Sequence, residues 1–106
     1  MENARLQELF NFLKEDPDDP FIIYAIAMEY GKVNLEKAME YYDKLLKYHN
    51  NYLPTYYHAA KLYEMIGNNL KASELYKKGM EISLAQKDMK AYRELMNALN
   101  EMDQIE

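Results

Sequence analysis

The segment YYHAAKLYEMIGNNLKASELY, residues 56–76, decides the fold. Its apolar and small residues recur at the spacing of an α-helix and not at the alternating spacing of a β-strand. The run Gly67-Asn68-Asn69 interrupts this pattern, as is typical of a helix end followed by a new helix start. The segment therefore predicts two helices joined by a tight turn.

An earlier part of the chain repeats this arrangement. Two patterns of small residues and tyrosine are shared at a distance of 33 or 34 residues: Ile26-Ala27-x-x-Tyr30 with Ala59-Ala60-x-x-Tyr63, and Ala38-x-x-x-Tyr42 with Ala72-x-x-x-Tyr76. A helix pair that recurs with this period is typical of an α-solenoid.

Apolar residues recur at helical spacing elsewhere in the chain, and helix breakers separate the segments. Asp19, Asn34 and Asp88 are expected N-caps, and Pro20 suits a first helical position. Gly31 is expected to stop the second helix. Six helices are predicted, over about residues 3–15, 20–30, 35–48, 54–66, 70–85 and 89–102.

The sequence thus predicts an all-α fold and one domain over residues 1–106. Its predicted parts are an N-terminal capping helix (1–16), two repeats (20–53 and 54–87) and a C-terminal capping helix (88–104). Two repeats alone are too few for stability, so the end helices must cover their apolar faces. We expect the following residues to do so: Phe10, Phe12 and Leu13 at one end, and Leu95, Met96 and Leu99 at the other.

Composition argues against several classes of partner. The chain has 106 residues, a formal net charge of −5 and no cysteine. Nucleic-acid phosphates and anionic lipids both require basic surfaces, and disulfides or thiolate chemistry require cysteine. The N-terminus has no signal-peptide pattern, and no apolar run approaches the ~18 residues of a membrane span. We expect a cytoplasmic protein that binds neither nucleic acid nor membranes.

Few side chains could support catalysis or bind a metal. His49 and His58 do not have the spacing of paired ligands, no serine has a histidine placed as its base, and three glycines cannot form a phosphate-binding loop. The acidic residues between 15 and 19 lack the length, glycine and closing glutamate of a calcium-binding loop, and helix capping explains them better. We expect no enzyme activity, no cofactor and no metal.

The repeated residues resemble those of the tetratricopeptide repeat (TPR) family. In that family a large residue, a small-residue pair and a tyrosine precede a turn glycine, and a small residue and an aromatic follow it. The second repeat has all of these in order: Tyr56, Ala59-Ala60, Tyr63, Gly67, Ala72 and Tyr76. The first repeat has Val33 near the place of the turn glycine, and Gly79 stands where the family prefers alanine. The whole chain is similar to short, stand-alone bacterial TPR proteins, which implies an α-solenoid.

The resemblance also implies a concave binding groove. In TPR proteins the residue after the large packing residue faces the groove, and the same register continues along the inner helices. The residues that it places there are Tyr24, Met28, Tyr57, Lys61, Glu64, Arg93 and Asn97. Lys61 and Arg93 would suit a carboxylate of a partner. The C-terminal carboxylate of heat-shock chaperones, a familiar TPR ligand, is disfavoured because Tyr24 and Met28 occupy places of its lysine and asparagine clamp.

We therefore predict a protein–protein interaction scaffold that binds a peptide segment of a partner in this groove and is a monomer. The alternative is a self-associating structural protein, a homodimer formed through an end helix or through exposed aromatic residues such as Tyr41, Tyr48 and Tyr52. The tyrosines at the packing positions of the repeats need no further function.

Overall fold

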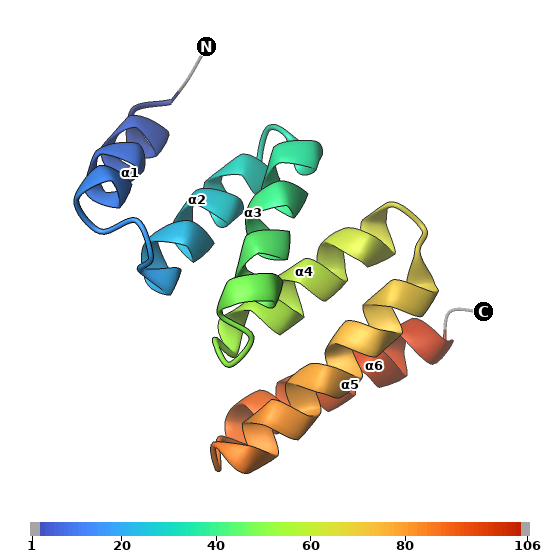
Figure 1. The fold of residues 1–106 in the computed structure, drawn as a ribbon. Helices are drawn as coiled ribbons and strands as arrows, with labels where there is room; N and C mark the ends of the chain where they lie inside the picture. The colour runs from blue at the N-terminus through green and yellow to red at the C-terminus, as the bar shows by residue number, and fades with distance from the viewer. Residues whose placement is uncertain (1–2, 105–106) are drawn as a thin grey trace. The chain divides into compact units, whose positions relative to one another are not determined.

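The computed structural model describes residues 3–104, and the regular structure of these residues is α-helical (Figure 1). The helices are α1 (Ala4–Glu15), α2 (Pro20–Gly31), α3 (Leu35–Tyr48), α4 (Pro54–Met65), α5 (Asn69–Ala85) and α6 (Met89–Gln104). The predicted all-α class with six helices is confirmed. The packing divides into two compact units, one up to Thr55 and one from Tyr56. The single domain and its repeat boundaries stay predictions.

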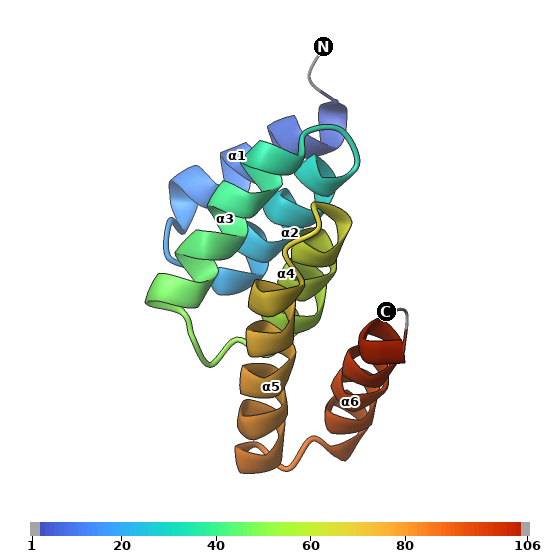
Figure 2. The ribbon, with the colours of Figure 1, turned by 90° about the vertical axis from the view of Figure 1, so that its right-hand side faces the viewer.

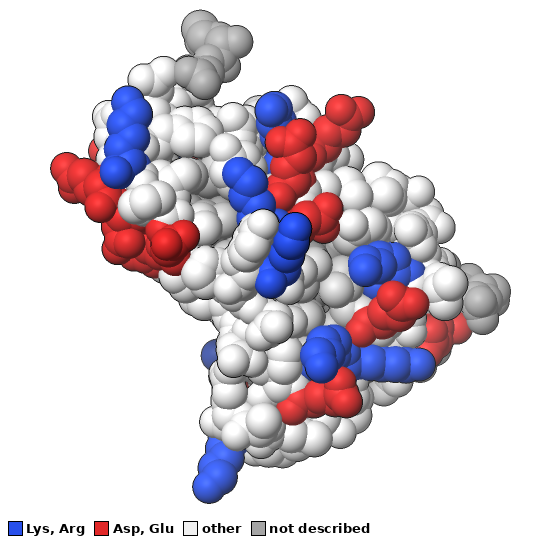
Figure 3. All heavy atoms as spheres, in the orientation of Figure 1, with Lys and Arg blue, Asp and Glu red and all other residues white. Residues whose placement is uncertain are grey.

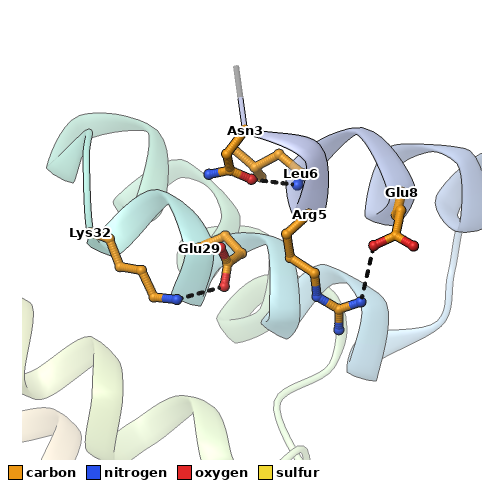
Figure 4. A network of polar contacts seen from close by, with 6 residues as sticks. All are labelled: Asn3, Arg5, Leu6, Glu8, Glu29 and Lys32. Carbon is orange, nitrogen blue, oxygen red and sulfur yellow. Dashed lines mark hydrogen bonds and ion pairs between the residues drawn. The ribbon is translucent and has the colours of Figure 1, made fainter. Parts of the chain in front are cut away.

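Asparagine and aspartate side chains fix where the helices begin, because their oxygens accept hydrogen bonds from backbone N–H groups that lack a partner within the helix. Asn3 Oδ1 accepts from the N–H of Leu6 at 2.7 Å (Figure 4). Asp19 Oδ1 accepts from Phe21 at 2.9 Å, with Pro20 at the first helical position. The same contact recurs at three other caps: Asn34 with Lys37 (3.1 Å), Asn68 with Lys71 (3.1 Å) and Asp88 with Ala91 (3.0 Å).

The turns after α4 and after α2 close in different ways. Gly67 has a φ of +84° and ends α4 in the left-handed conformation, as its sequence context predicts. The second helix, α2, stops at Gly31 as predicted, but without a left-handed residue. Gly31 is itself the last helical residue, and the cap after it, Lys32, keeps a right-handed backbone. The turn closes instead through the Tyr30 carbonyl, which accepts hydrogen bonds from Val33 and Asn34.

In the first unit, α1 packs on α2, and α2 packs on α3. Leu6, Leu9 and Ile26 form a buried cluster, with Phe10 and Leu13 packed against it. Phe10 and Leu13 therefore cover the apolar face as predicted. Phe12 does not, because it points away from that face and is 50% exposed.

In the second unit, α5 packs along α6, and Figure 2 shows the two helices side by side. Leu95 and Leu99 of α6 are buried, and Met96 is half-buried, so α6 covers α5 as expected of a capping helix. Gly79 allows this close packing. A Cβ at Gly79 would lie 2.8 Å from the Tyr56 Cβ and 3.0 Å from Leu95 Cδ1. The alanine that the TPR pattern prefers here would collide with both neighbours.

Charged side chains lie at the surface and pair within helices. Arg5 Nη1 lies 3.8 Å from Glu8 Oε1, and Lys32 Nζ lies 2.9 Å from Glu29 Oε2 (Figure 4). Over α5, acidic and basic side chains alternate on the face shown in Figure 3. Exposed pairs of this kind contribute little to stability.

Candidate partner-binding surface

The predicted groove residues of α4 form a compact polar and aromatic group. Lys61 Nζ lies 3.6 Å from Glu64 Oε2, one helical turn away. The same ammonium lies over the Tyr57 ring, 5.5 Å from its centroid. The three residues share one face of α4 because they follow one another at helical spacing. The structure thus brings these three together, as the sequence predicted.

Tyr76 of the neighbouring helix α5 packs against this group. Its ring meets that of Tyr57 edge-on, with centroids 6.3 Å apart, and lies 6.0 Å from Lys61 Nζ. Its hydroxyl donates a hydrogen bond to Glu64 Oε2. Tyr76 has no exposed surface, and burial together with the nearby Glu64 carboxylate raises the pKa of its phenol. We call Tyr57, Lys61, Glu64 and Tyr76 the α4 cluster.

The predicted groove residues of α6, Arg93 and Asn97, are exposed, and Glu101 follows them on the same helix at the same spacing. The Glu101 carboxylate lies near enough to the Tyr76 hydroxyl to raise the pKa of this phenol further. This stripe of α6 belongs to the second unit, as the α4 cluster does.

The remaining predicted groove residues, Tyr24 and Met28, belong to α2 in the first unit. Tyr24 is half-buried, and its ring meets that of Tyr52 edge-on at a centroid distance of 5.7 Å. Burial and this neighbour raise the pKa of the Tyr24 phenol. Met28, one turn further on, is exposed. A shallow depression of about 400 Å³ in this unit is lined by Pro20 and residues 48–52. Tyr24 and Met28 do not line it.

Two of the three aromatic residues named for self-association are not freely exposed. Tyr41 stacks on Tyr30 at a centroid distance of 5.7 Å and is half-buried, and Tyr52 is covered by Tyr24. Tyr48 is 67% exposed, as expected. The correction has a simple cause: Tyr41 and Tyr52 each pack on another tyrosine ring of this unit.

Comparison with solved structures assigns this arrangement to a family. The solution structure of a tetratricopeptide repeat domain protein from Salinibacter ruber is 34% identical to this chain, with a TM-score of 0.82. The match covers 86% of this chain and 93% of the other. This chain belongs to the tetratricopeptide repeat family.

Two solved structures of lower sequence identity share the fold alone. A protein from Bordetella parapertussis is 15% identical, with a TM-score of 0.82, over 97% of this chain and 90% of its own. MamA is 17% identical, with a TM-score of 0.65, over 93% of this chain and 65% of its own. No protein-family model matches the chain, and no curated protein matches it closely.

TPR domains are generally scaffolds for protein interaction and typically carry no catalytic function. In residues 3–104 of this TPR protein, no three histidine, aspartate or glutamate side chains gather as metal ligands would. The same residues contain no helix that is both long and apolar enough to cross a membrane. His58 is half-buried beside Tyr57, and burial lowers the pKa of its imidazole.

Sequence reasoning missed two members of this TPR surface. It assigned Tyr76 to packing alone, although the hydroxyl of this residue reaches Glu64, and it did not consider Glu101. The position of Glu101, eight residues after Arg93 on the same helix, could have identified it, because that spacing returns to the same face.

Proposed function

We propose that this TPR protein is a scaffold that binds a peptide segment of a partner protein on its second unit. The proposed surface consists of Tyr57, Lys61 and Glu64 of α4 with Arg93 and Asn97 of α6. Tyr24 and Met28 of the first unit stay predicted contacts with a peptide segment of the partner.

The proposal rests on one observation: both side chains of the Lys61–Glu64 ion pair of α4 are partly buried. The side chains of Lys61 and Glu64 are 37% and 20% exposed. By contrast, one side chain is at least 50% exposed in each of the pairs Arg5–Glu8, Lys32–Glu29, Lys37–Glu40 and Lys78–Glu81. Aromatic rings flank it on two sides. Charged groups are costly to remove from water. Partly buried charges on a binding surface contribute to the specificity of recognition.

The composition of this surface also fits recognition of another protein. Tyrosine and arginine are enriched where binding energy concentrates, since they combine apolar area with hydrogen-bonding groups. Asn97 adds both a donor and an acceptor for a peptide backbone. The surface offers no nucleophile paired with a base, so binding is the activity that it supports.

The test is capture of partners from a cell lysate by the immobilised chain, with quantitative mass spectrometry. We expect a protein that the wild type retains and that Tyr57→Ala and Arg93→Ala both lose. Tyr48→Ala is the matched control, because Tyr48 is an exposed tyrosine of α3 outside the surface. Thermal melting must show that each variant is folded, and Arg93 is exposed enough that its replacement leaves the core intact.

Identical capture by the wild type and both surface variants would contradict the proposal. Loss of capture with Tyr48→Ala instead would favour a contact through α3, and a concentration-dependent mass of the chain by itself would favour self-association.

A further inference from the structure

The α4 cluster already holds a cation, and that cation is its own Lys61. The ammonium lies 3.6 Å from the Glu64 carboxylate, 5.5 Å from the Tyr57 ring centroid and 6.0 Å from that of Tyr76. Aromatic faces and a carboxylate are the groups that recognise ammonium and guanidinium ions in proteins. The site is therefore built for a positive charge.

The groups around the ammonium are fixed, whereas Lys61 is not. Glu64 accepts a hydrogen bond from Tyr76, which is fully buried. Tyr57 is held between the Tyr76 ring and the His58 ring. The Lys61 ammonium stands at the end of a flexible four-carbon chain, so it can swing out to solvent at little cost.

The fixed charge next to the Tyr76 hydroxyl is negative. Glu64 contributes one carboxylate, and Glu101 of α6 contributes a second one whose charge reaches the Tyr76 hydroxyl. A carboxylate of a partner would have to bind beside both, to an ammonium that Glu64 already neutralises. A cation of a partner would gain the same contacts that Lys61 gives up.

We infer that the partner segment is basic, and that one of its lysine or arginine side chains replaces the Lys61 ammonium between Tyr57, Tyr76 and Glu64. This inference rests on the proposed function and specifies its ligand. It differs from the expectation, drawn from the sequence, that Lys61 receives an acidic group. Lys61 then acts as an internal competitor that keeps the site filled until a basic segment arrives.

The test uses short capped peptides as probes, Ac-Gly-Lys-Gly-NH2 and Ac-Gly-Arg-Gly-NH2, with Ac-Gly-Glu-Gly-NH2 as the acidic counterpart. Backbone amide shifts of the ¹⁵N-labelled full chain are followed by NMR at low salt. We expect the basic probes to shift the amides of Tyr57, Glu64 and Tyr76. Lys61→Ala should tighten this binding by about tenfold, because the vacated site no longer has to expel its own side chain.

Lys61→Ala/Glu64→Gln is the matched control, because the glutamine keeps an acceptor for the Tyr76 hydroxyl but removes the charge. It should lose the binding that Lys61→Ala gains. Should this variant melt at a much lower temperature, Lys61→Ala/Tyr57→Leu replaces it, since leucine keeps apolar volume without the ring.

Two results would overturn the inference. One is binding of the glutamate probe to the wild type at these amides, without binding of the basic probes. The other is equal binding of the basic probes with and without Glu64. Either result leaves the proposed function standing if the lysate capture still depends on Tyr57 and Arg93, so the two failures can be told apart.

Discussion

The Tyr76 hydroxyl donates a hydrogen bond to the Glu64 carboxylate and so links the core of the second unit to its surface. Tyr76 stands at a packing position of the TPR pattern, and its ring is fully buried between helices. Its hydroxyl end nevertheless reaches the face on which Tyr57 and Lys61 lie. One tyrosine can thus have both a packing role and a role at the surface, because the phenol ring is long enough to serve both.

Tyr76→Phe tests this link. The substitution keeps the ring and removes the hydroxyl, so the half-buried Glu64 loses this hydrogen bond. Hydrogen bonds to charged groups contribute about 1.5–3 kcal/mol, so we expect the free energy of unfolding to fall by roughly that amount. Urea denaturation measures it, with Tyr48→Phe as the control at an exposed tyrosine. Equal and negligible effects of the two substitutions would show that the bond to Glu64 carries no stability.

Two glycine-to-alanine substitutions should act in opposite directions. At Gly79 the new Cβ would lie 2.8 Å from Tyr56 Cβ, and overpacking of this kind costs about 1–3 kcal/mol. At Gly31 the new Cβ meets nothing within 4 Å, and the residue is helical, so alanine should stabilise by about 0.5–1 kcal/mol. Thermal melting decides the sign of each effect, and a rise in melting temperature for Gly79→Ala would contradict the close approach of α4, α5 and α6.

His58 should make stability depend on pH. Burial lowers the pKa of its imidazole below the ordinary 6.5, so the folded protein disfavours the protonated form. The stabilising effect is fully present above pH 6.5 and is lost as the pH falls from there toward the folded pKa, because the unfolded chain takes up the proton first. His58→Gln should therefore reduce the loss of melting temperature between about pH 7.5 and about pH 5.5. An unchanged loss would place the responsible group elsewhere.

Much of the fold could be predicted because local chemistry determines it. Asp19, Asn34 and Asp88 cap helices for reasons contained in their own side chains, and the recurrence of Ala59-Ala60 and Tyr63 reveals the repeat. Gly31 marks the end of α2, but its conformation does not follow from its identity, because glycine permits a left-handed turn without requiring one. Its turn closes through the Tyr30 carbonyl instead.

The candidate site was predicted less completely because its chemistry depends on packing between helices. Helical register identifies Tyr57, Lys61 and Glu64 as neighbours on α4, but it cannot show that a hydroxyl from α5 reaches Glu64. The charge of Lys61 is visible in the sequence, whereas its neutralisation by Glu64 and its place over two rings are not. Phe12 illustrates the same limit, since its exposure depends on how α1 rotates against α2.

Site-specific photo-cross-linking can show whether a partner protein binds on the α4 face of the second unit. A photoreactive p-benzoylphenylalanine replaces Tyr57 in one variant and Tyr48 in the other, and each variant is irradiated in the lysate. We expect an adduct of the chain with a heterologous protein from position 57 and none from position 48. An adduct from position 48 alone, or an adduct of two copies of this chain from either position, would show that partner binding does not occur on this face.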